Sequence, residues 1–437
     1  MDRPNLEIDA AIAEAHGRFL KANPKSAARH EGAKRALPGG NTRAVLWYEP
    51  FPLTLTGGEG CRVTDLDGNT YVDFVSEYTA GLYGHSNAKI AATIKSIADS
   101  GWVLGGPNPY EARLGQAIVD RYPAIERVRF CNSGTEANLM ALSTARAVTG
   151  RKSILAFDGG YHGGILTFAH GGSPLNAPYP FIFAQYNDLE GTATLIRQHA
   201  GDLAAVILEP MMGGGGCIAA EPEFLAMLRE ETAKAGIILI FDEVMASRLS
   251  YRGYHGMAGI KPDMISLGKY IGGGCSFGAF GGRADILDRF DPGRPDSFGH
   301  GGTFNNNVFS MAAGLTGFTE VLTEEALNRM NALGEELRAG MNALIAARGI
   351  GAVVTGVGSI MNLHFVAGEV TSPHDAEAGD PRLLHLWQIE SLLKRQYVTP
   401  RGMIALSLPI GRAEIVAFLD VFAEFLDSYR SVLPNRE

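Results

Sequence analysis

The fold of this chain follows from two segments, Ile238-Leu239-Ile240-Phe241-Asp242-Glu243-Val244 and Ser266-Leu267-Gly268-Lys269-Tyr270. Each segment contains a short apolar run that meets a charged residue, Asp242 in the first and Lys269 in the second. Continuous apolar runs of this length are typical of strands covered on both faces, as in the parallel sheet of an α/β fold. Ligands of such sheets bind beyond the carboxyl ends of the strands. We therefore expect Asp242 and Lys269 to lie together at that edge.

A buried aspartate and a buried lysine are energetically costly unless a ligand or a partner uses them. Pyridoxal 5'-phosphate uses both residue types, because a lysine amine forms an imine with its aldehyde and an aspartate keeps its ring nitrogen protonated. The pair therefore predicts a cofactor site in which Lys269 and Asp242 are the catalytic residues. Each residue alone fits a plainer role, a surface lysine or a structural carboxylate.

The segment Phe241-Asp242-Glu243-Val244, followed at this distance by Lys269, resembles the pyridoxal-phosphate aminotransferases of class III, which have fold type I. The resemblance extends from about Pro38 to Leu408. It is greatest to the branch that holds glutamate-1-semialdehyde aminomutase and the aromatic β-amino acid (β-phenylalanine) aminotransferases. It implies a large domain with a mainly parallel seven-stranded sheet and a smaller α+β domain built from both termini.

This resemblance also predicts the limits of the domains. We expect residues 1–75 to form an N-terminal arm and part of the small domain, and residues 76–310 to form the large cofactor-binding domain. Residues 311–437 are then a connecting helix and the C-terminal small domain. A length of 437 residues is sufficient for two or three domains with a substantial core.

Composition and charge exclude several classes of protein. The formal net charge is −9, so a broad nucleic-acid-binding surface is not expected. The four cysteines lie far apart without a CxxC spacing, which supports neither a zinc site nor a disulfide framework. The first residues form no apolar signal core, and no run has the length of a membrane span. We expect a cytoplasmic enzyme without a metal ion or a membrane partner.

A phosphate-binding turn is predicted where the strand at Arg127–Phe130 runs into Asn132-Ser133-Gly134-Thr135-Glu136-Ala137 and a helix follows. Free backbone N–H groups at the positive end of a helix bind anions. The resemblance assigns this role to Ser133, Gly134 and Thr135. An ordinary helix N-cap formed by Ser133 is the other interpretation of the same residues.

Three further cofactor contacts are implied by the resemblance. Tyr161, in the turn Gly160-Tyr161-His162-Gly163, matches the aromatic residue that stacks on the pyridine ring, and Glu209 matches a carboxylate that supports the site. Thr303 matches a threonine that reaches the phosphate of the neighbouring subunit. The expected assembly is therefore a homodimer in which each site is completed by the partner.

Two strand predictions concern the region before this large domain. The mixed apolar stretch Val45–Leu55 suggests a strand, and the alternation over Cys61–Phe74 around Asp67-Gly68 indicates a hairpin. Within the large domain, Gly278–Gly282 is expected to return antiparallel to the strand before Lys269.

Two arginines point to the substrate. Arginine binds a carboxylate through two parallel hydrogen bonds. In the β-phenylalanine aminotransferases, the arginine matching Arg43 takes the carboxylate of the β-amino acid, and the one matching Arg401 takes that of the keto acid. Tyr78 is the third expected substrate-binding residue. The resemblance thus implies transfer of an amino group from an aromatic β-amino acid, such as S-β-phenylalanine, to 2-oxoglutarate or pyruvate by a ping-pong cycle.

Two other functions stay open on the sequence alone. Glutamate-1-semialdehyde 2,1-aminomutase shares several motifs, but Arg401-Gly402-Met403 stands where the mutase carries a serine and then a glutamate. The segment after Met245 also departs from the usual pattern, which leaves the role of Arg248 unassigned. A non-enzymatic, cofactor-binding regulatory protein on the same fold is the third candidate.

Overall fold

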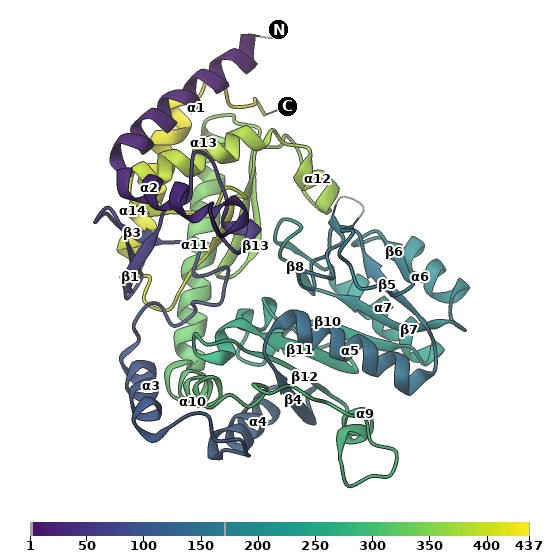
Figure 1. The fold of residues 1–437 in the computed structure, drawn as a ribbon. Coiled ribbons are helices and arrows are strands. Elements are labelled where there is room, and N and C mark those ends of the chain that lie inside the picture. Colours follow the sequence, from purple (N-terminus) through teal and green to yellow (C-terminus); the bar gives the residue numbers. More distant parts are fainter. Residues whose placement is uncertain (1–2, 170–171, 437) are drawn as a thin grey trace.

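The computed structural model describes residues 3–169 and 172–436, and its central element is a seven-stranded sheet (Figure 1). In spatial order the strands are β4 (Arg127–Cys131), β12 (Gly278–Gly282), β11 (Met264–Gly268), β10 (Ile238–Asp242), β7 (Leu203–Leu208), β5 (Ser153–Phe157) and β6 (Phe181–Ala184). Strand β12 runs antiparallel to both of its neighbours, whereas the other recorded pairings in this sheet are parallel. The mainly parallel seven-stranded sheet and the antiparallel return at Gly278–Gly282 are thereby confirmed.

Helices cover this sheet and its edges. They are α3 (Ala88–Ser100), α4 (Pro109–Arg121), α5 (Gly134–Thr149), α6 (Leu189–Gln198), α7 (Pro222–Ala235), α8 (Gly253–Ala258), α9 (Ala284–Leu287) and α10 (Val308–Thr316). Helix α5 packs against β7, β10, β11 and β12, and α7 packs against β10 and α6. The core therefore has the layered order of helix, sheet and helix that an α/β fold requires.

The central strand is buried on both faces, as its continuous apolar run predicts. Ile238 and Ile240 belong to the apolar cluster that contains the buried face of α5. Leu239 and Phe241 point the other way, into the larger cluster that contains the buried leucines of α7. Alternate side chains of a strand point to opposite faces, so both sets must be apolar when both faces are covered.

A second part of the molecule combines segments from both ends of the chain, and the two ends lie near each other in Figure 1. Its strands are β1 (Leu55–Glu59), β2 (Arg62–Asp65), β3 (Thr70–Asp73) and β15 (Gln396–Tyr397) in one sheet, and β13 (Val353–Val357), β14 (Ile360–His364) and β16 (Met403–Ala405) in another. Its helices are α1 (Arg3–Ala22), α2 (Pro24–Ala33), α11 (Glu324–Ala347), α12 (Pro373–Glu377), α13 (Pro381–Leu393) and α14 (Arg412–Ser428). A short hairpin, β8 (Met211–Met212) with β9 (Ile218–Ala219), belongs to the part that contains the seven-stranded sheet.

Strands β3 and β15 join these distant segments directly. They pair in parallel, with Val72 opposite Gln396. Strands β2 and β3 form the antiparallel pair predicted around Asp67-Gly68. The chain ends thus meet in one sheet, as the resemblance implies, while the exact domain limits stay a prediction.

The predicted strand over Val45–Leu55 is wrong. The structure has a single helical turn at η2 (Ala44–Leu46), and the first strand begins only at Leu55. Pro50 and Pro52 lack the N–H group that a strand ladder needs. Tyr48, Phe51 and Leu53 of this stretch are buried without a strand, whereas Trp47 and Leu55 are exposed.

Among residues 3–169 and 172–436, no helix combines the length and the apolarity that crossing a bilayer requires.

Candidate active site

Asp242 and Lys269 lie at the same edge of the seven-stranded sheet. Strands β10 and β11 are adjacent and parallel, and Asp242 is paired with Ser266 at their carboxyl ends. Lys269 follows β11 directly as the first residue of the short helical turn η5 (Lys269–Gly272), with φ of 53°. A non-glycine residue in this left-handed region is uncommon and is found mostly where the surroundings impose it.

The Asp242 carboxylate is buried and held by three donors. The backbone N–H of Val244 donates to Oδ1 at 3.0 Å. Asn138 Nδ2 and His162 Nδ1 lie 2.7 Å and 2.8 Å from Oδ2, and both must donate because an ionised carboxylate only accepts. A carboxylate has about four acceptor positions. One position on Oδ1 therefore remains for an N–H group of a ligand.

His162 and Asn138 are functional candidates that sequence reasoning missed. His162 is the neighbour of Tyr161 in the predicted stacking turn, and its position there was the available signal. Asn138 lies one helical turn after Gly134, so it faces the same side of α5 as the start of that helix. Neither residue is part of the sequence pattern that links Asp242 to Lys269. Their shared partner, Asp242, becomes evident only when the three segments are packed together.

Lys269 is poised to lose its charge. Burial lowers the pKa of its amine, the nearby carboxylates of Asp242 and Glu209 oppose this, and the positive charges of Arg43 and Arg248 lower it further. In the part of the chain that the structure describes, Lys269 Nζ has no hydrogen bond or ion pair with another side chain. A lysine in such surroundings can become neutral, as a base or a nucleophile must.

The predicted phosphate turn lies at the start of α5. Ser133 is the N-cap, and its hydroxyl accepts a hydrogen bond from the Glu136 N–H at 3.1 Å. Gly134 faces Val244, whose Cγ1 would lie 2.8 Å from a Cβ at that position. The Thr135 hydroxyl accepts from the N–H of Gly164 at 3.3 Å. The N-cap role of Ser133 is thus present, and it leaves other N–H groups of the first turn free for an anion.

Tyr161 and Glu209 form one unit beside Asp242. The buried Glu209 carboxylate accepts from the backbone N–H groups of Tyr161 and Gly213, both at 3.0 Å. The side chain of Tyr161 is 48% exposed. Glu209 therefore fixes the backbone that carries the ring, and the ring has an open face on which a flat ligand can stack.

Glu209 gives a prediction about pH. Burial raises the pKa of its carboxyl from 4.5 to about 7. A folded-state pKa above the unfolded value stabilises the fold below pH 4.5, and this contribution is lost as the pH rises through 7. Glu209→Gln has no such titration. Between pH 5 and pH 8, the wild type is expected to lose about 2–3 kcal/mol of unfolding free energy relative to Glu209→Gln.

Urea unfolding of both cofactor-free proteins at several pH values measures this difference. A difference in unfolding free energy that stays constant over that pH range contradicts the raised pKa.

Arg43, Tyr78 and Arg401 come together although they are far apart in sequence. The Arg43 guanidinium forms an ion pair with Glu77 and lies 5.7 Å from the centre of the Tyr78 ring. Burial raises the pKa of Tyr78 to about 12, against the opposing charges of Arg401 and Arg43. Both arginines are thus close enough to Tyr78 to affect it. Arg401 is exposed, and its backbone N–H donates to the Thr399 hydroxyl at 3.3 Å.

Tyr78 is carried by a strained turn. Ser76, Glu77, Tyr78 and Thr79 are four consecutive non-glycine residues with φ of 47°, 51°, 52° and 77°. Each left-handed residue costs about 1–2 kcal/mol. Gly81 closes the turn by donating to the Ser76 carbonyl at 2.7 Å. Such strain persists only where neighbouring contacts hold it, and it is found mostly at functional sites.

Thr303 is placed differently from the other candidates. It is exposed, and it precedes Phe304, which is 58% exposed. Within the described ranges, no hydrogen bond links Thr303 to Asp242 or to Lys269. A role at the site of a neighbouring subunit is thus still a prediction.

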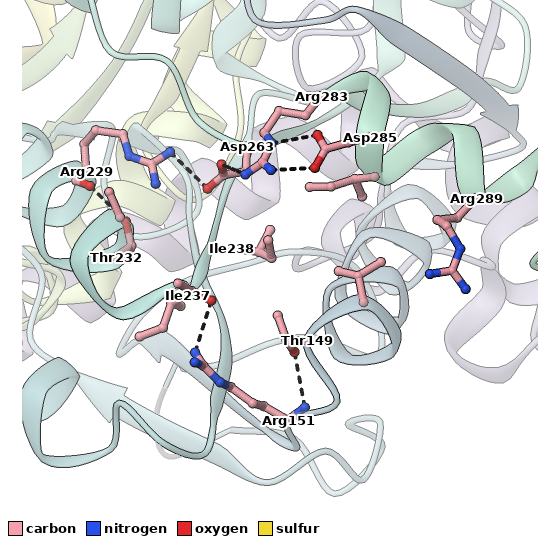
Figure 2. A pocket seen from close by; sticks show the side chains of 14 residues that line it. Thr149, Arg151, Arg229, Thr232, Ile237, Ile238, Asp263, Arg283, Asp285 and Arg289 are labelled. Carbon is pink, nitrogen blue, oxygen red and sulfur yellow. Dashed lines mark hydrogen bonds and ion pairs between the residues drawn. The ribbon is translucent and has the colours of Figure 1, made fainter.

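A separate hollow of about 600 Å³ lies at the opposite edge of the sheet, and Figure 2 shows the side chains that line it. Its lining includes residues where β10 and β11 begin and β12 ends, and its charged members include Arg151, Arg229, Asp263, Arg283 and Asp285. Asp263 accepts from both Arg229 and Arg283. The hollow has more arginines (Arg151, Arg229, Arg283 and Arg289) than aspartates (Asp263 and Asp285), so its lining carries a net positive charge. It contains neither Lys269 nor Asp242, so it is separate from the site that these two residues form.

The assembled residues fit pyridoxal 5'-phosphate. Asp242 keeps one acceptor position for the ring N–H, and at the neighbouring strand end Lys269 Nζ pairs with no other described residue. Tyr161 offers an open ring face, and the start of α5 offers free N–H groups where a side chain on Gly134 would strike Val244. These four features match the four parts of the cofactor that need a partner: nitrogen, aldehyde, ring face and phosphate.

Comparisons with known proteins agree with this fit. The family model described as aminotransferase class-III matches residues 45–380. The chain is 47% identical to the β-phenylalanine transaminase of Variovorax paradoxus, over 98% of each chain. It is 35% identical to a glutamate-1-semialdehyde 2,1-aminomutase of Bacillus velezensis, over 83% of this chain and 88% of the relative.

Solved structures give the same picture. The crystal structure of the β-phenylalanine aminotransferase from Variovorax paradoxus superposes with a TM-score of 0.97, covering 98% of this chain and all of that one, at 47% identity. A transaminase described with PLP bound superposes with a TM-score of 0.87 at 30% identity, covering 93% of this chain and 98% of that one.

Proposed function

Because the chain belongs to the class-III aminotransferases, enzymes of fold type I that use pyridoxal 5'-phosphate, we propose that it transfers the amino group of an aromatic β-amino acid to an α-keto acid. The observation that carries the choice of substrate is the pair of arginines, Arg43 and Arg401, which both lie near Tyr78. One carboxylate-binding residue for each substrate lets a single site take two different acids in turn.

The chain's own residues supply the proton transfers and the orientation. When bound, the cofactor supplies an electron sink and a temporary carrier for the amino group. Lys269 Nζ, once neutral, would take the proton from the donor carbon that bears the amine, hold it as an ammonium and deliver it to the cofactor instead of to that carbon. Asp242, held by Asn138 and His162, would hold the ring nitrogen with its negative charge. Tyr161 would keep the ring plane in place.

The function is tested with the holoenzyme and a panel of donors and acceptors. S-β-phenylalanine alone is expected to bleach the yellow colour of the bound cofactor, and 2-oxoglutarate or pyruvate to restore it. An aminomutase would instead isomerise glutamate 1-semialdehyde without any keto acid. Bleaching by α-amino acids but by no β-amino acid contradicts the proposal.

The two arginines give a paired prediction. Arg43→Ala is expected to raise KM for the β-amino acid about 10- to 100-fold and to leave KM for the keto acid nearly unchanged, because it removes charged hydrogen bonds to one substrate only. Arg401→Ala is expected to do the reverse. Steady-state kinetics with each substrate varied in turn measures both values. Equal losses for both substrates in each variant contradict separate roles.

We also propose that the active enzyme is a homodimer in which Thr303 completes the partner's site. Trp102, Val103, Leu104 and Phe304 are large exposed apolar side chains, and the loop of the first three meets the segment after Thr303, where Asn306 donates to the Gly106 carbonyl at 3.2 Å. An apolar surface of this kind is typical of a subunit interface.

Leu104→Asp is expected to yield monomers that retain cofactor poorly, as measured by sedimentation and by cofactor content. Monomers fully loaded with cofactor contradict the proposed dimer.

A cytoplasmic location stays a prediction from cysteine usage and is checked by cell fractionation.

A further inference from the structure

Arg248 is a buried cation beside the active site. Its side chain is fully buried in η4 (Ala246–Leu249), shortly after Asp242. The guanidinium donates to the carbonyl of Thr79 at 3.0 Å, to the carbonyl of Leu406 and to Met330 Sδ at 3.3 Å. In residues 3–169 and 172–436 no carboxylate forms an ion pair with it, and its Nε has no hydrogen-bond partner.

An unpaired buried charge is strongly unfavourable, so its presence calls for a role. Burial lowers the pKa of Arg248 to about 10, which leaves the group charged at neutral pH. The titratable groups that interact with it are the Lys269 amine, whose pKa its charge helps to lower, and the phenols of Tyr83 and Tyr270, which are neutral at that pH because burial raises the pKa of each. None of these groups supplies a negative charge. The main-chain carbonyls of Thr79 and Leu406 are therefore the principal compensation for the charge.

These two carbonyls belong to two segments that lie next to the proposed substrate-binding arginines. Thr79 ends the left-handed turn Ser76–Thr79, which presents Tyr78 and pairs Glu77 with Arg43. Tyr78 in turn donates its hydroxyl to the carbonyl of Val45 at 2.9 Å, two residues after Arg43. Leu406 ends the segment that leads from Arg401 through β16. Arg248 thus ties both segments to the strand that delivers Asp242.

We propose that Arg248 is a positioning residue that holds the left-handed turn at Tyr78 against the Leu406 segment, and thereby sets both substrate carboxylate sites at once. The planar guanidinium can reach two carbonyls in fixed directions, which a lysine ammonium does not reproduce. The inference rests on the proposed function, because it concerns the sites assigned there to Arg43 and Arg401.

The kinetic test compares Arg248→Met, Arg248→Lys and a matched control, Arg151→Met, in the holoenzyme. Arg151 likewise donates to main-chain carbonyls, those of Leu203, Ala235 and Gly236, but at the opposite edge of the sheet (Figure 2). Arg248→Met is expected to raise both KM values together and to lower kcat/KM by about 10²-fold, since small displacements of a substrate-positioning group have effects of this size.

Arg248→Lys is expected to recover part of this loss, and Arg151→Met to stay within about twofold of the wild type. This parallel change differs from that of Arg43→Ala or Arg401→Ala, each of which affects one substrate. Retained cofactor colour shows that the Arg248 variants are folded.

A second variant tests the turn itself. Thr79 is β-branched in a left-handed conformation, and its buried hydroxyl has no hydrogen-bond partner among the described residues. Glycine therefore relieves strain there without removing a hydrogen bond. The double variant Thr79→Gly/Arg248→Met is expected to recover at least threefold in kcat/KM over Arg248→Met alone. Amide hydrogen exchange of residues 74–83 is expected to rise in Arg248→Met and Arg248→Lys and to fall back in the double variant.

The inference is overturned if Arg248→Met keeps both KM values and the amide exchange of residues 74–83 at wild-type levels. If the methionine variant does not accumulate, the same criterion applies to Arg248→Lys. It is also overturned if Thr79→Gly gives no recovery. These outcomes all require a wild type that is active with the β-amino acid panel. Failure of the proposed function gives a different result, in which no β-amino acid bleaches the cofactor colour of the wild-type holoenzyme.

Discussion

Lys269→Ala is expected to lower turnover by about 10⁴-fold, the largest effect of any single substitution in this chain. We propose that Lys269, which follows β11 directly, is the residue that exchanges protons with the substrate. Burial already lowers the pKa of this amine, which makes the neutral base available near neutral pH. Alanine removes the amine and leaves the surrounding strand ends in place.

Three measurements check this expectation. Borohydride reduction of the wild-type holoenzyme followed by peptide mass spectrometry is expected to locate the cofactor on Lys269. Circular dichroism is expected to show that the alanine variant is folded. Lys261→Ala is the control, because Lys261 is an exposed lysine that forms an ion pair with Glu126 at 3.2 Å. An alanine variant at position 269 that keeps a tenth of wild-type turnover contradicts the assignment.

Asp242→Asn is expected to lower kcat by about 10³-fold, the second largest effect, because it removes a fixed charge aimed at the place where charge changes during the reaction. An amide also has a donor on one side, which would face the N–H of Val244 or the donors from Asn138 and His162. The variant therefore loses the charge and leaves a buried donor without an acceptor.

Asp263→Asn provides the matched control. Asp263 is a similarly buried carboxylate that binds Arg229 and Arg283 at the opposite edge of the sheet. Its substitution is expected to lower the melting temperature while leaving kcat of the folded protein close to that of the wild type. Asp242→Asn is expected to affect kcat far more than Tm. Equal losses of kcat in the two variants would remove the case for a catalytic Asp242.

The sequence predicts well those features that depend on neighbours along the chain. The strands that end at Asp242 and Gly268 are continuous apolar runs, and burial on both faces leaves few other conformations for them. The helix at Ser133 has a side-chain cap and a small-residue turn, so its start is visible in the sequence. The strand prediction for Val45–Leu55 is wrong because its buried apolar residues, Tyr48, Phe51 and Leu53, pack without a strand ladder, which Pro50 and Pro52 prevent.

Features that depend on distant partners are not visible in the sequence. His162 and Asn138 meet on Asp242 only because three segments converge there. The role of Arg248 needs both the carbonyl of Thr79 and the carbonyl of Leu406, which are separated by most of the chain. The four left-handed residues Ser76–Thr79 also include no glycine, the residue type that would have indicated this conformation in the sequence. Their conformation is imposed by tertiary contacts and not by local preference.

The parallel pairing of β3 with β15 has a consequence for how the protein is made. Val72 leaves the ribosome long before Gln396, its eventual neighbour in the sheet. At synthesis rates of about 5–20 residues per second, the edge of β3 waits for roughly 15 to 65 s before its partner exists. An open strand edge of this kind is a site for misassembly with other nascent chains. Added chaperones or a low growth temperature are therefore expected to raise the yield of correctly assembled protein in a new host.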